Sequence, residues 1–143
     1  MIGLIRNLSR GFIALVLLAT AIGKLLDVPG FVGVLESYQA ITPSLLWPLA
    51  LGIPLAELAL GGWLVLGWRL DLSGAASAAM HSVYAAWSAW AVLRGLKLAN
   101  CGCFGVFLAR PLGWSTVIED GVMIAVSLGL VAASRQALSA ERR

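Results

Sequence analysis

Four long stretches of this chain carry almost no charge, and they limit what it can fold into. They run roughly from Gly11 to Leu26, Leu45 to Trp68, Leu72 to Leu93 and Leu112 to Ser134. The last three can cross a hydrocarbon layer of about 30 Å, which takes about 20 helical residues. The first stretch reaches that length only if a preceding helical turn is added to it, or if the Lys24 side chain reaches out so that its ammonium group lies at the membrane surface. Continuous apolar runs lack the two-residue alternation of a membrane β-barrel, so they predict helices.

The composition indicates that lipid is the solvent for these helices. Only 12% of the residues are charged and 60% are hydrophobic, whereas a soluble domain carries about 25% charged residues. The prediction is a single all-α domain over residues 1–143, an integral membrane four-helix bundle with helices at about 5–26, 45–68, 72–94 and 112–134. The net charge of +3 is small, and the arginines lie at segment ends, which favours membrane orientation over nucleic-acid binding.

The basic residues also predict how the bundle is oriented in a bacterial-type inner membrane. With the N-terminus inside, the cytoplasmic side collects Arg6, Arg10, Arg69, Arg135, Arg142 and Arg143, and the outer side collects Lys24, Arg94, Lys97 and Arg110. This excess of inner positive charge predicts that both termini are cytoplasmic and that the loop from Arg94 to Arg110 faces the periplasm. Ala19-Thr20-Ala21 resembles a signal-peptidase site, but an uncleaved first helix is preferred, because its loss would leave three spans.

The outer connection after the first helix is long enough to hold a further short helix. Val28-Pro29-Gly30 is expected to break the first helix, and Pro43 precedes the second. Between them, Phe31 to Tyr38 predicts a short helix in the membrane interface, with Phe31, Leu35 and Tyr38 on one face.

The only two cysteines, Cys101 and Cys103, lie one residue apart in the string NCGCFG. A disulfide between them would close a very small ring, which removes little loop entropy and requires a tight turn at Gly102. Two thiolates could also hold Cu(I), whereas structural zinc needs four ligands. Placement outside the membrane and flanking positive charge favour a third interpretation, a redox-active dithiol. The cysteines are therefore predicted to be catalytic, with copper binding and a structural role left open.

Several charged residues are predicted to lie within the bundle. Glu57 is about midway along the second helix, and a carboxylate there needs a proton, a partner or water. Glu119 and Asp120 lie about two turns into the fourth helix, so Lys24 is predicted to pair with one of them. Lys24, Glu57, Glu119 and Asp120 are candidates for a proton relay. The alternative is that these charges form ion pairs that only hold the helices together. His81 is expected to lie far from the cysteine loop and to serve packing.

These residues together resemble the MauE branch of the DoxX-like membrane protein family. The resemblance rests on Gly23-Lys24-Leu25-Leu26-Asp27, Phe31, Tyr38, Pro54-Leu55-Ala56-Glu57, Asn100-Cys101-Gly102-Cys103-Phe104-Gly105, Trp114 and Asp120. It spans about Arg10 to Ser134. It implies a four-helix inner-membrane protein that works beside a thioredoxin-like periplasmic partner, since MauE is implicated in maturing the disulfide-rich small subunit of methylamine dehydrogenase. The DoxX relatives imply coupling to a quinone.

By position, the resemblance marks Cys101 and Cys103 as the redox pair and Lys24, Glu57 and Asp120 as polar positions in the bundle. Membrane oxidases of the DsbB or vitamin K epoxide reductase type have a second cysteine pair, which this chain lacks. The predicted function is therefore a membrane thiol–disulfide oxidoreductase whose single pair exchanges with a thioredoxin-like protein or dithiol client and with a carrier such as quinone. The alternatives are a non-enzymatic membrane anchor for such a partner and a Cu(I)-handling membrane protein.

Overall fold

Five helices form the computed structural model, which describes residues 1–141. They are α1 (Ile2–Leu25), α2 (Val28–Ser37), α3 (Pro43–Leu66), α4 (Leu70–Leu93) and α5 (Trp114–Glu141). The described residues contain no strand, so the all-helical prediction is confirmed. Arg142 and Arg143, which contribute to the predicted inner positive charge, lie outside the described residues.

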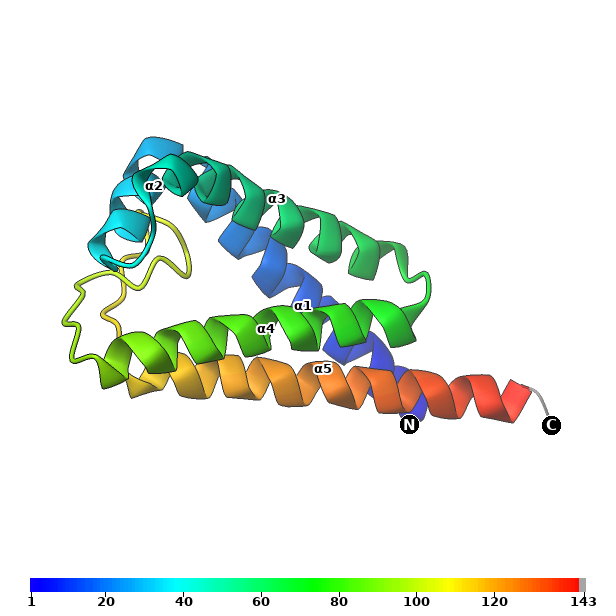
Figure 1. Cartoon of the computed structure of the whole chain (residues 1–143). Coiled ribbons are helices and arrows are strands. Elements are labelled where there is room, and N and C mark those ends of the chain that lie inside the picture. The colour runs from blue at the N-terminus through cyan, green and yellow to red at the C-terminus, as the bar shows by residue number, and fades with distance from the viewer. Residues whose placement is uncertain (142–143) are drawn as a thin grey trace.

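The four long helices form two packed pairs that diverge toward one end (Figure 1). The most extensive contacts join α4 to α5 and α1 to α3, and α1 also packs on α5. By contrast, α3 and α4 contact each other little, although a tight turn joins them. At the end where α3 and α4 stand apart, α2 and the loop of residues 94–113 lie together, opposite the two termini (Figure 1).

Short sequence signals set where the helices begin and end. Asp27 caps α2 by accepting a hydrogen bond from the Gly30 backbone N–H at 2.8 Å. Gly67 ends α3 in the left-handed conformation, with φ of 73°, which glycine adopts without steric cost. The predicted starts of the long helices lie within about three residues of the observed ones, but α5 continues well beyond the predicted end at 134.

The short helix predicted from Phe31 to Tyr38 is present as α2. Its predicted apolar face is confirmed, because Phe31, Leu35 and Tyr38 are all buried. Phe31 and Leu35 pack against Leu46 and Ala50 of α3. The helix therefore covers the end of the bundle.

Three of the helices are long and apolar enough to cross a membrane. The candidate spans are Gly3–Leu25, Pro43–Leu66 and Trp114–Ala137. Helix α4 is as long as α3 but is not among these spans. Four of its polar residues, Ser73, Ser77, His81 and Ser88, are buried, and Ser77 Oγ lies 3.0 Å from Ser127 Oγ of α5. The polar face of α4 is therefore turned into the protein.

Candidate functional site

The cysteines lie in a tight loop that Asn100 organises from both sides. Asn100 Oδ1 accepts a hydrogen bond from the Gly102 backbone N–H at 2.9 Å, and its side-chain amide donates to the Gly105 carbonyl at 3.0 Å. Gly102 and Gly105 have φ of 78° and 74°, a region that favours glycine. At the base of the loop, the Cys101 backbone N–H donates to the Arg110 carbonyl at 2.7 Å.

This loop is docked onto the C-terminal end of α1 through two glycines. A Cβ atom at Gly23 would collide with the Phe104 carbonyl oxygen, and one at Gly105 would collide with the Gly23 carbonyl. The two backbones can approach this closely only without side chains. A second tether comes from α2, because Tyr38 Oη donates to the Cys101 carbonyl at 2.8 Å. The motifs GK and CGCFG, which are far apart in sequence, thus form one contact.

Substituting Gly105 with alanine is expected to undock this loop. The left-handed backbone alone costs about 1–3 kcal/mol for a residue with a side chain, and the collision with Gly23 adds to that cost. Gly95→Ala is the matched control, because Gly95 has φ of 75° but open space within 4 Å of the position that a Cβ atom would take. Thermal unfolding in detergent and maleimide labelling of the cysteines should show a larger effect for Gly105→Ala. Equal effects of the two variants would contradict the docking role.

The two thiols are free, half-buried and in direct contact. Their Sγ atoms lie 2.6 Å apart, and the Cys103 backbone N–H points to Cys101 Sγ at 3.4 Å. The hydrogen bond from Cys103 lowers the pKa of Cys101 to about 6, and Arg110 contributes in the same direction. The same hydrogen bond raises the pKa of Cys103, because that thiol must keep its proton to donate it, and burial adds to the effect. Cys101 is therefore the activated sulfur of the pair.

The predicted partner of Lys24 is wrong. Lys24 pairs with Glu57 instead of Glu119 or Asp120, and its Nζ lies 2.7 and 2.9 Å from the two carboxylate oxygens. Lys24 is 4% exposed and Glu57 1%. Tyr84, which the sequence did not single out, donates its hydroxyl hydrogen to the same carboxylate at 2.9 Å. Lys24 reaches Glu57 because α1 packs on α3, and the long side chain of the lysine extends inward to the middle of α3.

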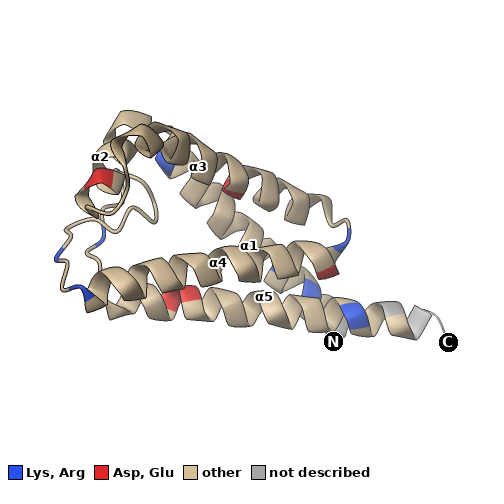
Figure 2. Ribbon diagram, viewed as in Figure 1, with Lys and Arg blue, Asp and Glu red and all other residues tan. Residues whose placement is uncertain are grey.

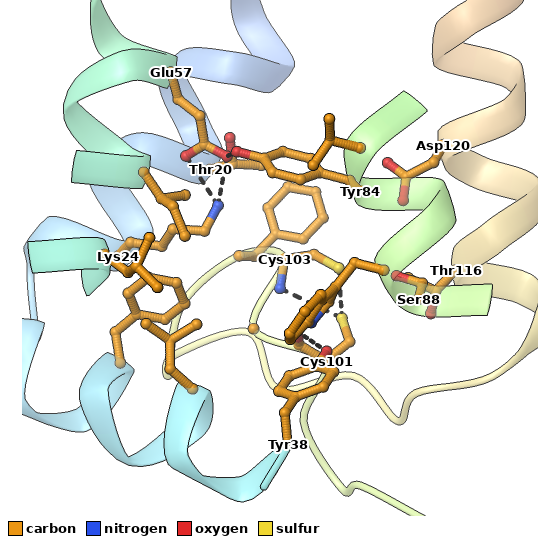
Figure 3. A pocket seen from close by; sticks show the side chains of 18 of the residues that line it. Thr20, Lys24, Tyr38, Glu57, Tyr84, Ser88, Cys101, Cys103, Thr116 and Asp120 are labelled. Atoms are coloured by element: carbon orange, nitrogen blue, oxygen red, sulfur yellow. Dashed lines mark hydrogen bonds and ion pairs between the residues drawn. The ribbon is translucent and has the colours of Figure 1, made fainter. Parts of the chain in front are cut away.

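The two acidic residues of α5 face different surroundings. Glu119 is exposed and pairs with Arg110, whose Nη1 lies 2.7 Å from Oε2. This ion pair connects the cysteine loop to α5. Asp120 is half-buried and points toward the same space as the cysteines (Figure 3). Among the described residues it has no salt bridge.

A cavity of about 490 Å³ connects the dithiol with the buried ion pair. Its polar lining comprises Thr20, Lys24, Tyr38, Thr42, Glu57, His81, Tyr84, Ser88, Cys101, Cys103, Thr116, Glu119 and Asp120. Most of the remaining lining is apolar and includes Trp87, and Figure 3 shows the labelled polar side chains around the space. The cavity thus brings together all six residues that the sequence predicted for the site.

The expected distance between His81 and the cysteine loop is also wrong. His81 lines the same cavity as the two cysteines, because the loop folds back into the end of the bundle. Its Nδ1 lies 2.9 Å from the Ser77 carbonyl, which fits the packing role expected for it. Within residues 1–141 no group of three His, Cys, Asp or Glu side chains is placed to hold a metal ion.

Comparison with known proteins identifies relatives over nearly the whole chain. The family model described as methylamine utilisation protein MauE matches residues 2–133. The chain is 34% identical over 121 residues to the methylamine utilization protein MauE of Paracoccus denitrificans, covering 85% of this chain and 65% of the relative. It is 30% identical over 123 residues to that of Paracoccus versutus, covering 86% and 66%. The chain thus spans slightly less than two thirds of the length of these relatives. No solved structure matches.

Proposed function

Because the chain belongs to the MauE family, we propose that it is a membrane thiol–disulfide relay that oxidises a periplasmic partner in methylamine utilisation. The observation that carries the proposal is the contact between the thiols of Cys101 and Cys103. They lie at one end of the bundle in a loop that hydrogen bonds of Asn100 keep in place. A loop that served only to join two helices would not need the hydrogen bonds from Asn100 to both sides of the cysteines or the close packing of its backbone on α1.

The proposed membrane arrangement has four spans, with α4 as the fourth. The serines and His81 of α4 lower its hydropathy, but His81 and three of the four serines are buried. The fourth, Ser82, is exposed and donates its hydroxyl hydrogen to the Ala78 carbonyl at 2.7 Å. The residues that it exposes include Leu72, Val83, Trp90 and Leu93. A lipid-facing helix needs an apolar outer surface, and its inner face can be polar. This distribution supports a four-helix membrane domain with α2 covering one end.

The proposed orientation places the cysteine loop in the periplasm and both termini in the cytoplasm. The loop lies at the end of the helices opposite the termini (Figure 1), so the two are expected on different sides of the membrane. Figure 2 shows Lys and Arg on the loop at one end and near the α3–α4 turn and the termini at the other. The excess of inner positive charge favours this orientation. An oxidising compartment is the one in which a dithiol can cycle.

In the proposed reaction the oxidised form of the relay accepts two electrons from a partner dithiol. A partner thiolate attacks the Cys101–Cys103 disulfide at Cys101, forming a mixed disulfide and releasing Cys103 as a thiolate, which takes up a proton. The second partner thiolate then attacks the mixed disulfide and releases Cys101 as a thiolate. The partner leaves as a disulfide, and the relay returns to the reduced pair of the structure. A thiol with a lowered pKa is the better leaving group, which suits Cys101 to this step.

Trapping of mixed disulfides in intact cells tests the proposal. In Cys103→Ser the Cys101 thiolate can still attack the disulfide of the oxidised partner, a thioredoxin-like protein or dithiol client, and it lacks the second sulfur that would resolve the product. The resulting mixed disulfide is expected after acid quenching. Cys101→Ser is the matched control and should trap much less. The measurement is a non-reducing gel shift with mass spectrometry of the shifted band.

Three outcomes would contradict this function. A cysteine pair that stays in one redox state with and without its partner would exclude a relay. Stoichiometric copper in anaerobically purified protein, lost in Cys101→Ser, would favour Cu(I) handling. Normal partner assembly in the double cysteine variant would favour a membrane anchor without redox chemistry.

A further inference from the structure

The cavity has its opening between α3 and α4, where these helices stand apart. Leu45 of α3 and Val83 of α4 both line the cavity and are 51% and 65% exposed. Helices α3 and α4 contact each other little, whereas α1 packs on α3 and α4 packs on α5. These two exposed side chains are apolar, and the lining also has exposed residues in Ala40 and Thr42 just before α3 and in Glu119 of α5. If the long helices span the membrane, the cavity opens sideways into lipid.

The inner end of the cavity presents a hydrogen-bond donor that is already held in place. Lys24 Nζ directs two of its three N–H groups to Glu57, so one N–H is not used by that carboxylate. Tyr84 Oη lies beside it, hydrogen-bonded to Glu57 at 2.9 Å. Both side chains line the cavity, and Figure 3 shows Tyr84 extending toward the space above Cys103. A ligand with an apolar body and a carbonyl oxygen matches this lining.

The relay itself also requires an acceptor that can reach the sulfurs. The chain has two cysteines, so no second dithiol can carry the electrons onward. Oxidation of Cys101 and Cys103 to a disulfide releases two electrons and two protons. The acceptor must therefore take both, and an apolar molecule that enters the cavity from the lipid side can reach the sulfurs.

We propose that this cavity binds a lipid-soluble quinone, which enters between α3 and α4 and oxidises the Cys101–Cys103 dithiol. The inference rests on the relay proposed above. In the net step both S–H bonds break and the S–S bond forms. The quinone gains two electrons and two protons and leaves as hydroquinone through the same opening. Lys24 acts as a positioning residue whose remaining N–H donates to one quinone carbonyl, while Tyr84 stays hydrogen-bonded to Glu57 beside it. The volume of about 490 Å³ is within the range that holds a small organic ring system.

Substitution at the opening tests the route and the site together. In Val83→Trp the larger side chain should block the opening. Val122→Trp is the matched control, because Val122 is a 52% exposed valine on α5 that does not line the cavity. Leu45→Trp tests the opposite side of the opening. All three variants are expected to keep the wild-type unfolding temperature, since each site is exposed.

The first measurement follows oxidation of the reduced protein in nanodiscs by decylubiquinone without oxygen. Val83→Trp and Leu45→Trp are expected to slow disulfide formation at least tenfold, whereas Val122→Trp should match wild type. Mass spectrometry distinguishes the disulfide from a quinone adduct. Reduction of the oxidised pair by a water-soluble dithiol should proceed at the same rate in all four proteins, because that reaction takes place at the loop.

The second measurement reports binding without turnover. An azido-quinone photoprobe should label the cavity-lining segments of α3 and α4, and excess decylubiquinone should suppress the labelling. Oxidation rates that are equal in wild type, Val83→Trp and Leu45→Trp would overturn the proposed site. Exchange with dithiols but no oxidation by decylubiquinone would overturn the quinone and leave the relay standing. Cysteines that react with neither would overturn both proposals.

Discussion

Removing either member of the buried ion pair is expected to destabilise the protein more than any other single substitution discussed for this chain. In Lys24→Met the Glu57 carboxylate keeps only the Tyr84 hydrogen bond. A buried charge without its partner costs about 3–5 kcal/mol. Glu57→Leu leaves the Lys24 ammonium in the same position, so a loss of the same size is expected. The measurement is reversible unfolding in mixed micelles.

The double variant separates charge pairing from packing. Lys24→Met/Glu57→Leu removes both charges, and apolar side chains of similar volume often replace a buried ion pair with little loss. The double variant is therefore expected to recover most of the stability lost by the single ones. Arg69→Met is the control at an exposed pair, that of Arg69 with Asp71, and should lower the free energy of unfolding far less than Lys24→Met does, because water screens exposed pairs. A double variant as unstable as the sum of the single ones would show that the residues do not act as a pair.

The choice of partner for Lys24 shows where prediction from the sequence ends. The apolar runs identify the long helices, and Gly67 and Pro43 mark their limits within a few residues. Which helix faces which, however, depends on contacts between residues far apart in the chain. The sequence places Lys24 at one end of its helix and Glu57 at the middle of another, so it predicts no contact between them. The packing of α1 on α3 and the reach of the lysine stem bring them together.

The surroundings of the cysteines are predictable only in part. The string NCGCFG identifies Cys101 and Cys103, and the polarity of Asn100 between apolar residues is the signal for its bracketing role. The helical pattern predicts the correct face for Tyr38, but it does not predict the hydrogen bond to the loop. Tyr84 carries no local signal at all, since one tyrosine in an apolar helix usually serves packing. Its role depends on Glu57, which lies 27 positions away in sequence.

The largest expected chemical effect is the reactivity of Cys101 at neutral pH. Its pKa of about 6, against an ordinary value of 9, means that about 90% of this thiol is thiolate at pH 7, compared with about 1% of an ordinary one. The thiolate is the reactive form, so the alkylation rate of Cys101 should rise with pH and level off above the pKa. Iodoacetamide labelling of the reduced protein between pH 4 and pH 10, read by mass spectrometry, is expected to give a midpoint near 6.

Two substitutions at Cys103 test the cause of that low pKa. Cys103→Ser keeps a hydroxyl that can donate to Cys101 Sγ, whereas Cys103→Ala removes the donor. Since the hydrogen bond from Cys103 is the largest contribution, the midpoint should move up toward 9 in Cys103→Ala and less in Cys103→Ser. Arg110→Gln should raise it by a smaller amount, because Arg110 acts through its charge alone. Equal midpoints in Cys103→Ser and Cys103→Ala would mean that Cys103 does not activate Cys101 through a hydrogen bond, and the division of roles between the two sulfurs would fail.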